Sequence, residues 1–499
     1  MNPNGKSNIE RLTTGVPTLD AILHGGFPTR TLNVITGGPG AGKSILALQI
    51  LFHQARLGNM DIYFTSIAEP SIKFLRYMQQ FEFFDSKLFN RNIFFSDLSA
   101  PALSQGLEET ISALKQQIAE RGPAIVAIDS FKALRSRLQD PAAAQPLLYN
   151  LVLDLAISNV SAFIVGEYDD YDVSHLPEFF AADSIVSLSR QTTGLRVSRQ
   201  LEVLKLRGSG YEPGRHFFEI SSGGITVYPR VSVPPEKEGE GEDEHRLSTG
   251  VAGLDQMLGG GLPELSTTVI EGGTGTGKTT LALSYLVEGA RKGEPGLFLT
   301  MDETCSQVIK LAAGRGWDLR SFIAKGLLEV IYISPLDYIA DALLQMAKRS
   351  IERLGARRVA VDSLNGLSLS IAAEGRGQEL VYALVKTFRA MGATAILTNE
   401  TSQLLGTTEL SGHGLSAVAD NIVMLRYAEV QSRLATAVSV LKVRGSRHDD
   451  MLRELIITGD RVEVLGPFQI HQGVLTGSST RQEDEPSPQR PKRTRTSEA

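Results

Sequence analysis

Short apolar runs rich in β-branched residues alternate along the chain with longer segments of helical pattern. In the first half the apolar runs cover residues 31–35, 62–65, 125–128 and 162–165, and in the second half 267–270, 296–300, 358–361 and 394–398. Segments such as 44–54 and 336–353 lie between them and space their apolar residues as a helix does. Strands that are apolar on both faces and alternate with helices are typical of a parallel sheet covered on both sides. We therefore predict an α/β fold with mainly parallel sheets flanked by helices.

The second half of the chain repeats landmarks of the first half in the same order. Residues 14–16 recur at 249–251, a glycine-rich loop ending at Ser44 recurs with its end at Thr279, and Lys-x-Arg-Gly-Ser occurs at 205–209 and 442–446. These landmarks are displaced by 235 to 237 residues, and the apolar run that ends in Asp129 recurs as one that ends in Asp362, 233 residues later. This displacement is a whole domain, far above the roughly 20–50 residues of solenoid repeats. Two tandem domains are expected, at residues 1–230 and 246–477.

Two segments have compositions that cannot supply a hydrophobic core. Residues 231–245 form a linker rich in Gly, Glu and Asp, and residues 478–499 form a Pro- and Arg-rich tail. We expect a flexible acidic linker and a disordered tail. The basic cluster at 490–495 has two interpretations: a solubilising tail, which we favour, or a contact for an acidic partner.

Both halves contain a complete phosphate-binding P-loop, at residues 37–44 and 272–279. The glycines permit positive φ angles, the following helix directs its positive end at the anion, and the lysine reaches the terminal phosphates. The sequence therefore predicts two ATP-binding loops. The predicted contacts are Gly40, Ala41, Gly42, Lys43, Ser44 and Ile45 in the first half, and Thr274, Gly275, Thr276, Gly277, Lys278, Thr279 and Thr280 in the second.

An aspartate ends the third apolar run of each half, at Asp129 and Asp362. This is the position of a Walker B carboxylate beside the nucleotide's magnesium ion. Together with the hydroxyls of Ser44 and Thr279, these carboxylates are predicted to hold Mg²⁺.

Hydrolysis or phosphoryl transfer also needs a carboxylate that polarises the attacking oxygen. The second apolar run of the second half is followed by the pair Asp302-Glu303, whereas the first half has Ala68 followed by Glu69. We predict Asp302, Glu303 and Glu69 as catalytic residues, and Asp302 is also a candidate magnesium ligand. The alternative is that these acids are solvated loop residues.

Composition narrows the classes of function. With one cysteine, no intrachain disulfide or thiolate zinc cluster can form, and no apolar run reaches the roughly eighteen residues of a membrane span, so a cytoplasmic protein is expected. The net charge of −6 disfavours nucleic-acid binding. A DNA-dependent ATPase would need basic loops in both halves, but Lys132, Arg135 and Arg137 occur only in the first. A nucleotide-gated scaffold without catalysis is the other alternative, which Ala68 favours for the first half.

Taken together, these motifs and their order resemble the KaiC family of cyanobacterial circadian clock proteins, from about residue 13 to residue 481. The resemblance implies two RecA-like P-loop domains in a double-ring homohexamer, with ATP between subunits. In that family the Lys-x-Arg segments reach the neighbour's triphosphate. The residues that match family contacts with the nucleotide are Lys205, Leu206, Arg207, Ser209, Lys442, Val443, Arg444, Ser446 and His448. Arg315 stands where the family's second half has an aromatic residue near the adenine, and its planar guanidinium is expected to stack there instead.

The resemblance further implies a slow ATPase in the first ring and a Ser/Thr autokinase in the second. Asp302 matches the second-ring base, while Ala68 replaces the matching acid of the first ring. Ser416 matches a phosphorylated serine of the family, but Ala417 replaces the adjacent threonine, so an ordered two-site cycle cannot run there. The resemblance also implies clock-type or signalling protein partners, although the tail departs from the family's partner-binding segment.

Overall fold

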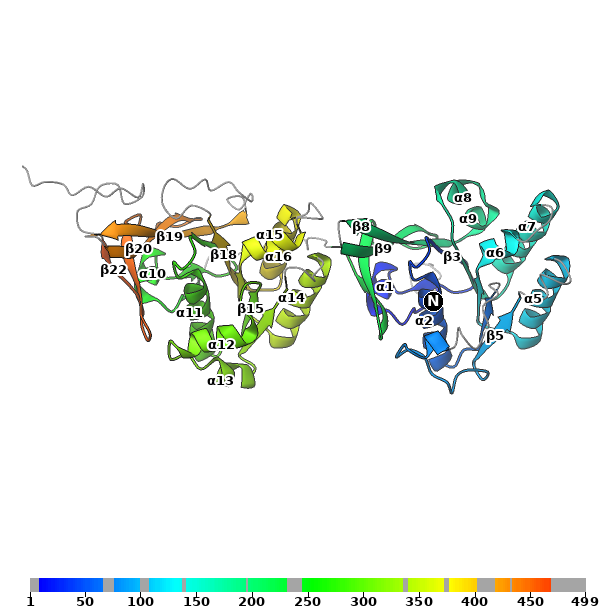
Figure 1. Cartoon of the computed structure of the whole chain (residues 1–499), viewed down its shortest axis with the longest axis horizontal. Helices are drawn as coiled ribbons and strands as arrows, with labels where there is room; N and C mark the ends of the chain where they lie inside the picture. The colour runs from blue at the N-terminus through cyan, green and yellow to red at the C-terminus, as the bar shows by residue number, and fades with distance from the viewer. Residues whose placement is uncertain are drawn as a thin grey trace, which may run out of the picture. The chain divides into compact units, whose positions relative to one another are not determined.

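A computed structural model of the chain shows two compact units, Met1–Arg230 and Val231–Ala499. The structure describes residues 9–65, 76–98, 107–136, 141–193, 196–230, 245–334, 340–371, 377–401, 418–430 and 433–467. Figure 1 labels the helices and strands, and we describe each unit by itself.

The first unit is built on a nine-stranded sheet of order β11-β10-β9-β8-β3-β7-β6-β4-β5. The strands from β8 to β5 are parallel, and β9, β10 and β11 extend the sheet in antiparallel fashion. Its elements are β1 (Arg11–Leu12), α1 (Pro17–Ile22), β2 (Phe27–Pro28), β3 (Leu32–Gly37), α2 (Lys43–Arg56), β4 (Asp61–Thr65), β5 (Ile93–Asp97), α5 (Leu107–Arg121), β6 (Ile125–Asp129), α6 (Phe131–Ser136), α7 (Pro141–Ile157), β7 (Ser161–Gly166), α8 (Asp170–His175), α9 (Pro177–Ala181), β8 (Ser184–Thr193), β9 (Arg196–Leu206), β10 (Arg215–Ser221) and β11 (Gly224–Tyr228).

The second unit repeats this topology in a sheet of order β16-β15-β17-β18-β14-β19-β20-β21-β22. Again the strands from β16 to β19 are parallel and the last three are antiparallel. Its elements are β12 (Arg246–Leu247), α10 (Ala252–Met257), β13 (Leu262–Pro263), β14 (Thr267–Gly272), α11 (Lys278–Arg291), β15 (Gly296–Thr300), α12 (Cys305–Ala313), α13 (Leu319–Ala324), β16 (Leu328–Tyr332), α14 (Ala340–Leu354), β17 (Arg358–Asp362), α15 (Leu364–Ile371), α16 (Gly377–Ala390), β18 (Thr394–Glu400), β19 (Asn421–Val430), β20 (Arg433–Val443), β21 (Arg453–Ile457) and β22 (Val462–Pro467).

The predicted α/β class is confirmed, because all eight apolar runs become parallel strands. The antiparallel extension of each sheet was not predicted. Its strands mix buried and exposed positions, as in the pattern of β20, and so lack the continuous apolar runs of a doubly covered strand.

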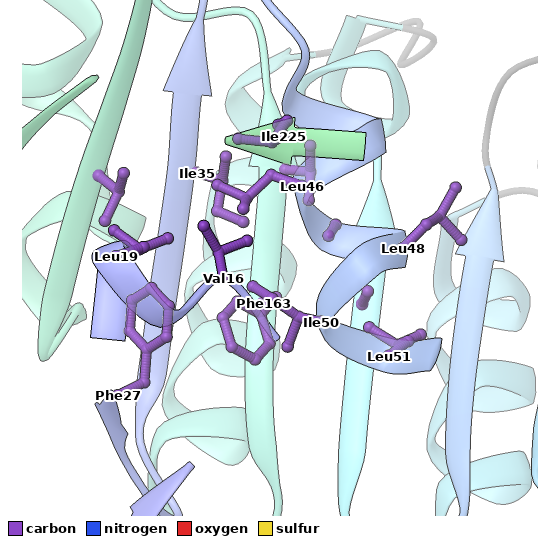
Figure 2. Packing of buried hydrophobic residues seen from close by; sticks show 14 of the residues in the cluster. Val16, Leu19, Phe27, Ile35, Leu46, Leu48, Ile50, Leu51, Phe163 and Ile225 are labelled. Atoms are coloured by element: carbon purple, nitrogen blue, oxygen red, sulfur yellow. The ribbon is translucent and has the colours of Figure 1, made fainter. Parts of the chain in front are cut away.

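Alternate residues of the central strands point into two different cores. In β3, Val34 belongs to the cluster beneath α5 and α7, while Ile35 belongs to the cluster around α2. Figure 2 shows the second cluster, in which Leu46 and Ile50 of α2 pack near Ile35 and Phe163. Each such buried aliphatic side chain contributes about 1.5–3 kcal/mol. The packing holds the helix that follows the P-loop firmly against the sheet.

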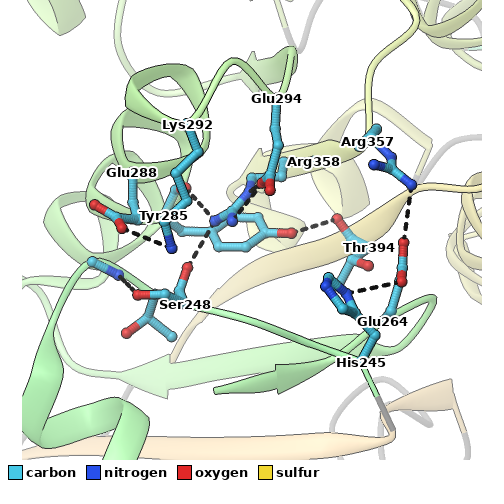
Figure 3. A network of polar contacts seen from close by, with 12 residues as sticks. His245, Ser248, Glu264, Tyr285, Glu288, Lys292, Glu294, Arg357, Arg358 and Thr394 are labelled. Carbon is cyan, nitrogen blue, oxygen red and sulfur yellow. Dashed lines mark hydrogen bonds and ion pairs between the residues drawn. The ribbon is translucent and has the colours of Figure 1, made fainter. Parts of the chain in front are cut away.

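One buried polar cluster distinguishes the second unit (Figure 3). Arg358, at the start of β17, is fully buried and donates to Glu294 Oε2 at 2.7 Å and to the carbonyl oxygens of Ser248 and Tyr285 at 2.7 and 2.9 Å. Gly289 of α11 makes room for it, because a Cβ there would lie 2.3 Å from Arg358 Cδ. The cluster therefore connects helix α11 to strand β17, which ends at Asp362.

Within the described part of the chain, no helix has both the length and the apolar character needed to cross a membrane.

Candidate functional site

The first P-loop connects β3 to α2 at the carboxyl edge of the parallel strands. Gly40 and Gly42 have φ angles of 68° and 104°, in the left-handed region that glycine adopts without strain. A Cβ on Gly42 would also lie 2.8 Å from Cδ1 of Ile220. Lys43 is buried, and its ammonium donates to the carbonyl oxygen of Gly38 at 2.8 Å and lies 3.5 Å from Glu167 Oε1. The loop therefore has the backbone shape and the cation of a phosphate cradle.

Asp129, at the end of β6, lies beside this loop. Its Oδ2 accepts hydrogen bonds from the Ser44 hydroxyl and, at 2.6 Å, from the Tyr63 hydroxyl. Burial, together with the Asp129 carboxylate, raises the pKa of Tyr63 well above its ordinary value. Tyr63 therefore stays protonated and keeps donating to the carboxylate.

The second P-loop connects β14 to α11 in the same way. The Lys278 ammonium donates to the carbonyl oxygens of Gly272 and Gly273, at 2.9 and 2.8 Å. Burial lowers the pKa of Lys278, and the carboxylates of Glu400, Asp362 and Asp302 oppose this shift. The ammonium of Lys278 thus interacts with three carboxylates at this edge of the unit.

Asp362, at the end of β17, is the counterpart in the second unit of Asp129 in the first. Its Oδ2 accepts from the Thr279 hydroxyl at 2.7 Å, and its Oδ1 accepts from the Thr398 hydroxyl. Burial, with a further contribution from Asp302, raises the pKa of Asp362. A bound cation would offset this penalty on the charged carboxylate.

The oxygen donors at both sites are of the kind that Mg²⁺ prefers. Each P-loop pairs one carboxylate with one hydroxyl, Asp129 with Ser44 and Asp362 with Thr279. In the described residues no group of three or more His, Cys, Asp or Glu side chains forms a protein-only metal cage. Magnesium in nucleotide sites keeps few protein ligands and takes the rest from phosphates and water, so the residues present fit this ion.

The predicted acid pair of the second unit lies next to Asp362. Asp302 Oδ2 accepts a hydrogen bond from the Ser363 hydroxyl at 2.8 Å. Glu303 Oε2 is buried and finds no hydrogen-bond partner among the described residues. Burial, followed by the charges of Asp362 and Asp302, raises the pKa of Glu303. The two acids therefore have different environments, with Asp302 held beside the Walker B strand.

Arg315 follows α12 and reaches the helix after the second P-loop. Its Nη2 donates to the Thr280 hydroxyl at 3.0 Å. Its buried Nε has no acceptor in the described part of the unit. The structure thus brings this predicted adenine contact to the P-loop helix.

The P-loops lie at the carboxyl end of the parallel strands, whereas the Lys-x-Arg residues lie at the amino end of those strands. In the first unit, Leu206 of β9 pairs with Ser184 at the beginning of β8, whereas Gly37 of the P-loop pairs with Leu188. Four strand residues separate the two edges, or roughly 13 Å at about 3.3 Å per residue. In the second unit Val443 pairs with Asn421 at the beginning of β19, whereas Gly272 of the P-loop pairs with Leu425, four residues further along that strand. The structure therefore does not bring these residues to the P-loop of their own unit.

At that far edge the basic side chains contact their own unit only lightly. Arg207 is 57% exposed and lies 3.6 Å from Asp183, and Arg444 is 72% exposed and lies 3.5 Å from Asp420. Burial and then Arg207 lower the pKa of Lys205, against the opposing effect of Asp183.

The other matching residues lie at the same edge. Lys442 donates to the carbonyl oxygen of Ala419 at 2.7 Å, and the Ser209 hydroxyl donates to that of Gly210 at 2.8 Å. Ser446 and His448 follow β20 and are half-buried.

Two predicted residues lie outside the described residues, namely the catalytic candidate Glu69 and the phosphorylation candidate Ser416. Their neighbours Ala68 and Ala417 lie outside them as well.

Several residues near the P-loops were missed by the sequence reasoning. Glu167 directly follows β7 and lies near Lys43, and Glu400 ends β18 and lies near Lys278. They are 233 residues apart, which is also the spacing of Asp129 and Asp362. The duplication alone could therefore have pointed to these two glutamates as equivalent residues of the two sites. The sequence offered no such indication for Tyr63 and Thr398, whose hydroxyls donate to Asp129 and Asp362. These two residues come from strands that are not equivalent in the two units.

A cavity of about 830 Å³ opens at the first P-loop. Lys132 of α6 and Arg199 of β9 line it together with Lys43, Asp129 and Glu167. The sequence reasoning had treated Lys132 only as a possible DNA contact and had not considered Arg199.

Comparison with known proteins agrees with this duplicated arrangement. The family model described as the KaiC ATPase matches the chain twice, over residues 12–232 and 247–468. The chain is similar to the circadian clock oscillator protein KaiC of Picosynechococcus sp., with 28% identity over 490 residues, covering 96% of this chain and 94% of the relative. It is 27% identical to that of Rippkaea orientalis over 488 residues, covering 96% and 93%. It is also 27% identical to KaiC 1 of Synechocystis sp. over 486 residues, covering 95% and 93%.

Proposed function

Because the chain belongs to the KaiC family of ATPases, we propose that both units bind Mg·ATP and that the second unit hydrolyses it and phosphorylates the chain itself. The observation that carries the proposal is the acidic cluster at the second P-loop. There Asp302 is held by Ser363, and Asp362 by Thr279, beside the ammonium of Lys278. This arrangement combines a phosphate cradle, a metal-binding pair and a separate carboxylate for the attacking oxygen.

In this proposal the residues divide the work of phosphoryl transfer. The backbone of the P-loop and Lys278 bind and orient the triphosphate. Asp362 and Thr279, with Asp302 as a further candidate ligand, would hold Mg²⁺, which neutralises charge on the β- and γ-phosphates when bound. Asp302 accepts the proton of the attacking hydroxyl as the new P–O bond forms and the bond to ADP breaks. The attacking group is water in hydrolysis and a serine hydroxyl in autophosphorylation.

We further propose that the nucleotide lies between two chains of a homohexameric ring. The position of Arg207 and Arg444 at the sheet edge opposite their own P-loops supports this, as does their exposure. A cation supplied by a neighbour completes the site only when the ring is assembled.

For the phosphorylated residue we propose Ser416. It occupies the position of a family phosphoserine, and Ala417 leaves no second hydroxyl beside it. Since the relatives are named circadian clock oscillator proteins, we propose that the chain works with protein partners in a timing or signalling circuit.

A second function is favoured for the first unit by one observation. Ala68 stands where a leading acid would stand, so this unit lacks the counterpart of Asp302. We propose that the first unit holds ATP mainly to support assembly, with Glu69 as its remaining catalytic candidate. If the second unit were inactive as well, the whole chain would be a nucleotide-gated scaffold.

The test is incubation of the purified chain with γ-labelled Mg·ATP, followed by phosphate release and mapping of the labelled residue. We expect released phosphate and label on Ser416, both lost in Asp302→Asn, and loss of label alone in Ser416→Ala. Normal label in Ser416→Ala would refute that site. Normal ATP binding with neither label nor released phosphate would replace the enzyme proposal by the scaffold.

A further inference from the structure

Two cations flank the first P-loop that do not belong to its motif. In the sheet order β9-β8-β3-β7-β6, the P-loop follows β3, Arg199 lies in β9, and Lys132 follows β6. The two side chains thus come from opposite sides of the loop, Arg199 from strand β9 and Lys132 from helix α6. Both line the 830 Å³ cavity that also contains Lys43.

Lys132 is held in place by α8. Its ammonium forms an ion pair with Asp172, whose Oδ2 also accepts from the backbone N–H of Asp169 at 3.1 Å in a helix-capping arrangement. The ammonium also lies 5.7 Å from the centre of the buried Tyr168 ring. A lysine that is already ordered at the cavity loses less side-chain entropy when it binds an anion.

Arg199 is a half-buried residue with one buried donor that its own unit does not satisfy. Its cross-strand partner in β8 is Arg190, and like charges directly opposite each other destabilise a strand pair. Its Nε is buried and has no acceptor among the described residues. A buried charged donor without an acceptor is unfavourable, and an anion in the cavity would supply both the acceptor and the missing charge.

The second unit has neutral residues at both positions. Asn365 stands three residues after Asp362, as Lys132 stands three after Asp129, and its amide donates to the carbonyl oxygen of Glu400 at 2.9 Å. Thr436 stands eight residues before Arg444, as Arg199 stands eight before Arg207. Its cross-strand partner is Tyr427, which donates to the backbone of the P-loop. The second site therefore lacks both extra charges.

We propose that Lys132 and Arg199 form a clamp on the nucleotide's phosphates within one chain, specific to the first site. The clamp lets the first unit hold ATP before ring assembly, whereas the second unit depends on Lys442 and Arg444 of a neighbouring chain. This inference rests on the proposed function, and it assigns to the two sites different affinities in the unassembled chain.

The test measures ATP binding by the full-length chain, diluted until mass photometry shows monomers. In a Lys278→Ala background, which weakens the second site, titration with a fluorescent ATP analogue reports the first. The swaps Lys132→Asn and Arg199→Thr introduce the residues of the second unit. Each is expected to raise the Kd of the first site roughly tenfold to hundredfold, as for the loss of one hydrogen bond to a charged group. The salt dependence of the Kd becomes shallower in both variants.

Matched controls use the same substitutions away from the cavity. Lys115 is an exposed lysine paired with Asp154, and Arg215 an exposed arginine paired with Glu202. Lys115→Asn and Arg215→Thr are expected to leave the Kd and its salt dependence within about twofold, since surface pairs contribute little. The conservative variants Lys132→Arg and Arg199→Lys are expected to recover most of the affinity. Thermal unfolding without nucleotide checks that each variant folds.

An unchanged Kd in folded Lys132→Asn and Arg199→Thr chains would overturn the clamp, as would equal losses in the two surface controls. A reciprocal gain supports it: in a Lys43→Ala background, Asn365→Lys with Thr436→Arg should tighten the second site in the monomer. These outcomes concern binding alone. Absence of phosphate release with normal binding would refute the proposed enzyme and leave the clamp intact.

Discussion

Lys278 and Arg444 lie next to opposite ends of the parallel strands of one sheet, Lys278 at the carboxyl end and Arg444 at the amino end. Lys278 follows β14, whose last residue Gly272 pairs with Leu425, while Arg444 follows Val443, which pairs with Asn421 at the start of β19. About 13 Å of strand separates the two ends, and neither side chain is long enough to reach across the sheet from one end to the other. One chain therefore does not bring both groups to one nucleotide.

This relationship predicts complementation between inactive chains. Lys278→Ala and Arg444→Ala are each expected to lose second-site phosphate release. When equal amounts of the two variants are mixed and their subunits exchange, roughly a quarter of the second sites should recover activity. In a head-to-tail ring, that fraction of the interfaces combines an intact P-loop of one chain with an intact Arg444 of its neighbour. Phosphate release against mixing ratio measures the recovery. A double Lys278→Ala/Arg444→Ala chain is the control, and a mixture as inactive as its components would contradict the trans arrangement.

The proposed base predicts a specific pair of variants. Asp302→Asn keeps the shape of the side chain but removes its basicity, so phosphate release is expected to fall by about a hundredfold or more while the Kd for ATP changes little. Asp302→Glu retains a carboxylate and should keep a larger share of the rate. The effect appears in kcat rather than KM. Equal losses in both variants would indicate that Asp302 has a structural role through its bond to Ser363.

The buried Asp61 predicts a pH-dependent stability of the first unit. Asp61 begins β4 and is fully buried, and burial raises its pKa from 3.8 to about 8. Between these values the folded unit binds one proton more than the unfolded chain, so the free energy of unfolding falls as pH rises, by at most about 1.4 kcal/mol per pH unit. Asp61→Asn removes this slope. Denaturant unfolding from pH 5 to 9 measures the free energy of unfolding of both proteins. The amount by which Asp61→Asn exceeds the wild type in this free energy should grow up to about pH 8 and then stay constant.

The same substitution at an exposed carboxyl serves as the control for that measurement. Asp154 of α7 is 49% exposed, and Asp154→Asn should leave the slope unchanged. Parallel pH profiles for wild type and Asp61→Asn would show that Asp61 does not bind the extra proton.

The Arg358 cluster predicts coupled effects on stability. Arg358→Met leaves the Glu294 carboxylate and two buried carbonyl oxygens without their donor, and should lower the free energy of unfolding of the second unit by about 3 kcal/mol. Gly289→Ala overpacks the same place and should cost about 1–3 kcal/mol. Because the clash is with Arg358, the double variant should lose less than the sum. Urea unfolding measures all three.

Gly377→Ala is the matched glycine control, because a Cβ there would meet no atom within 4 Å. Strict additivity of the two cluster variants would contradict the contact between Gly289 and Arg358.

Much of this protein could be predicted from its sequence because the signals are local. Apolar runs such as 125–128 and 358–361 predict strands that are buried on both faces. The P-loop glycines indicate a backbone conformation that only glycine adopts easily. The repeat then doubles the evidence for each element. The antiparallel strands escaped prediction because partial burial leaves a weaker periodic signal.

Only the tertiary structure decided which distant residues meet. Residues 85 positions apart, Ser44 and Asp129, meet because parallel strands end at one sheet edge, while Lys43 and Arg207 separate because β9 runs back to the other edge. The duplicated sequence suggests two equivalent sites, yet Arg199 and Lys132 face a P-loop in one unit and Thr436 and Asn365 take their places in the other. Sequence determined the elements and the chemistry of the loops, because both depend on neighbouring residues. The grouping of charges around each loop depends on strand order and register, which only the folded chain contains.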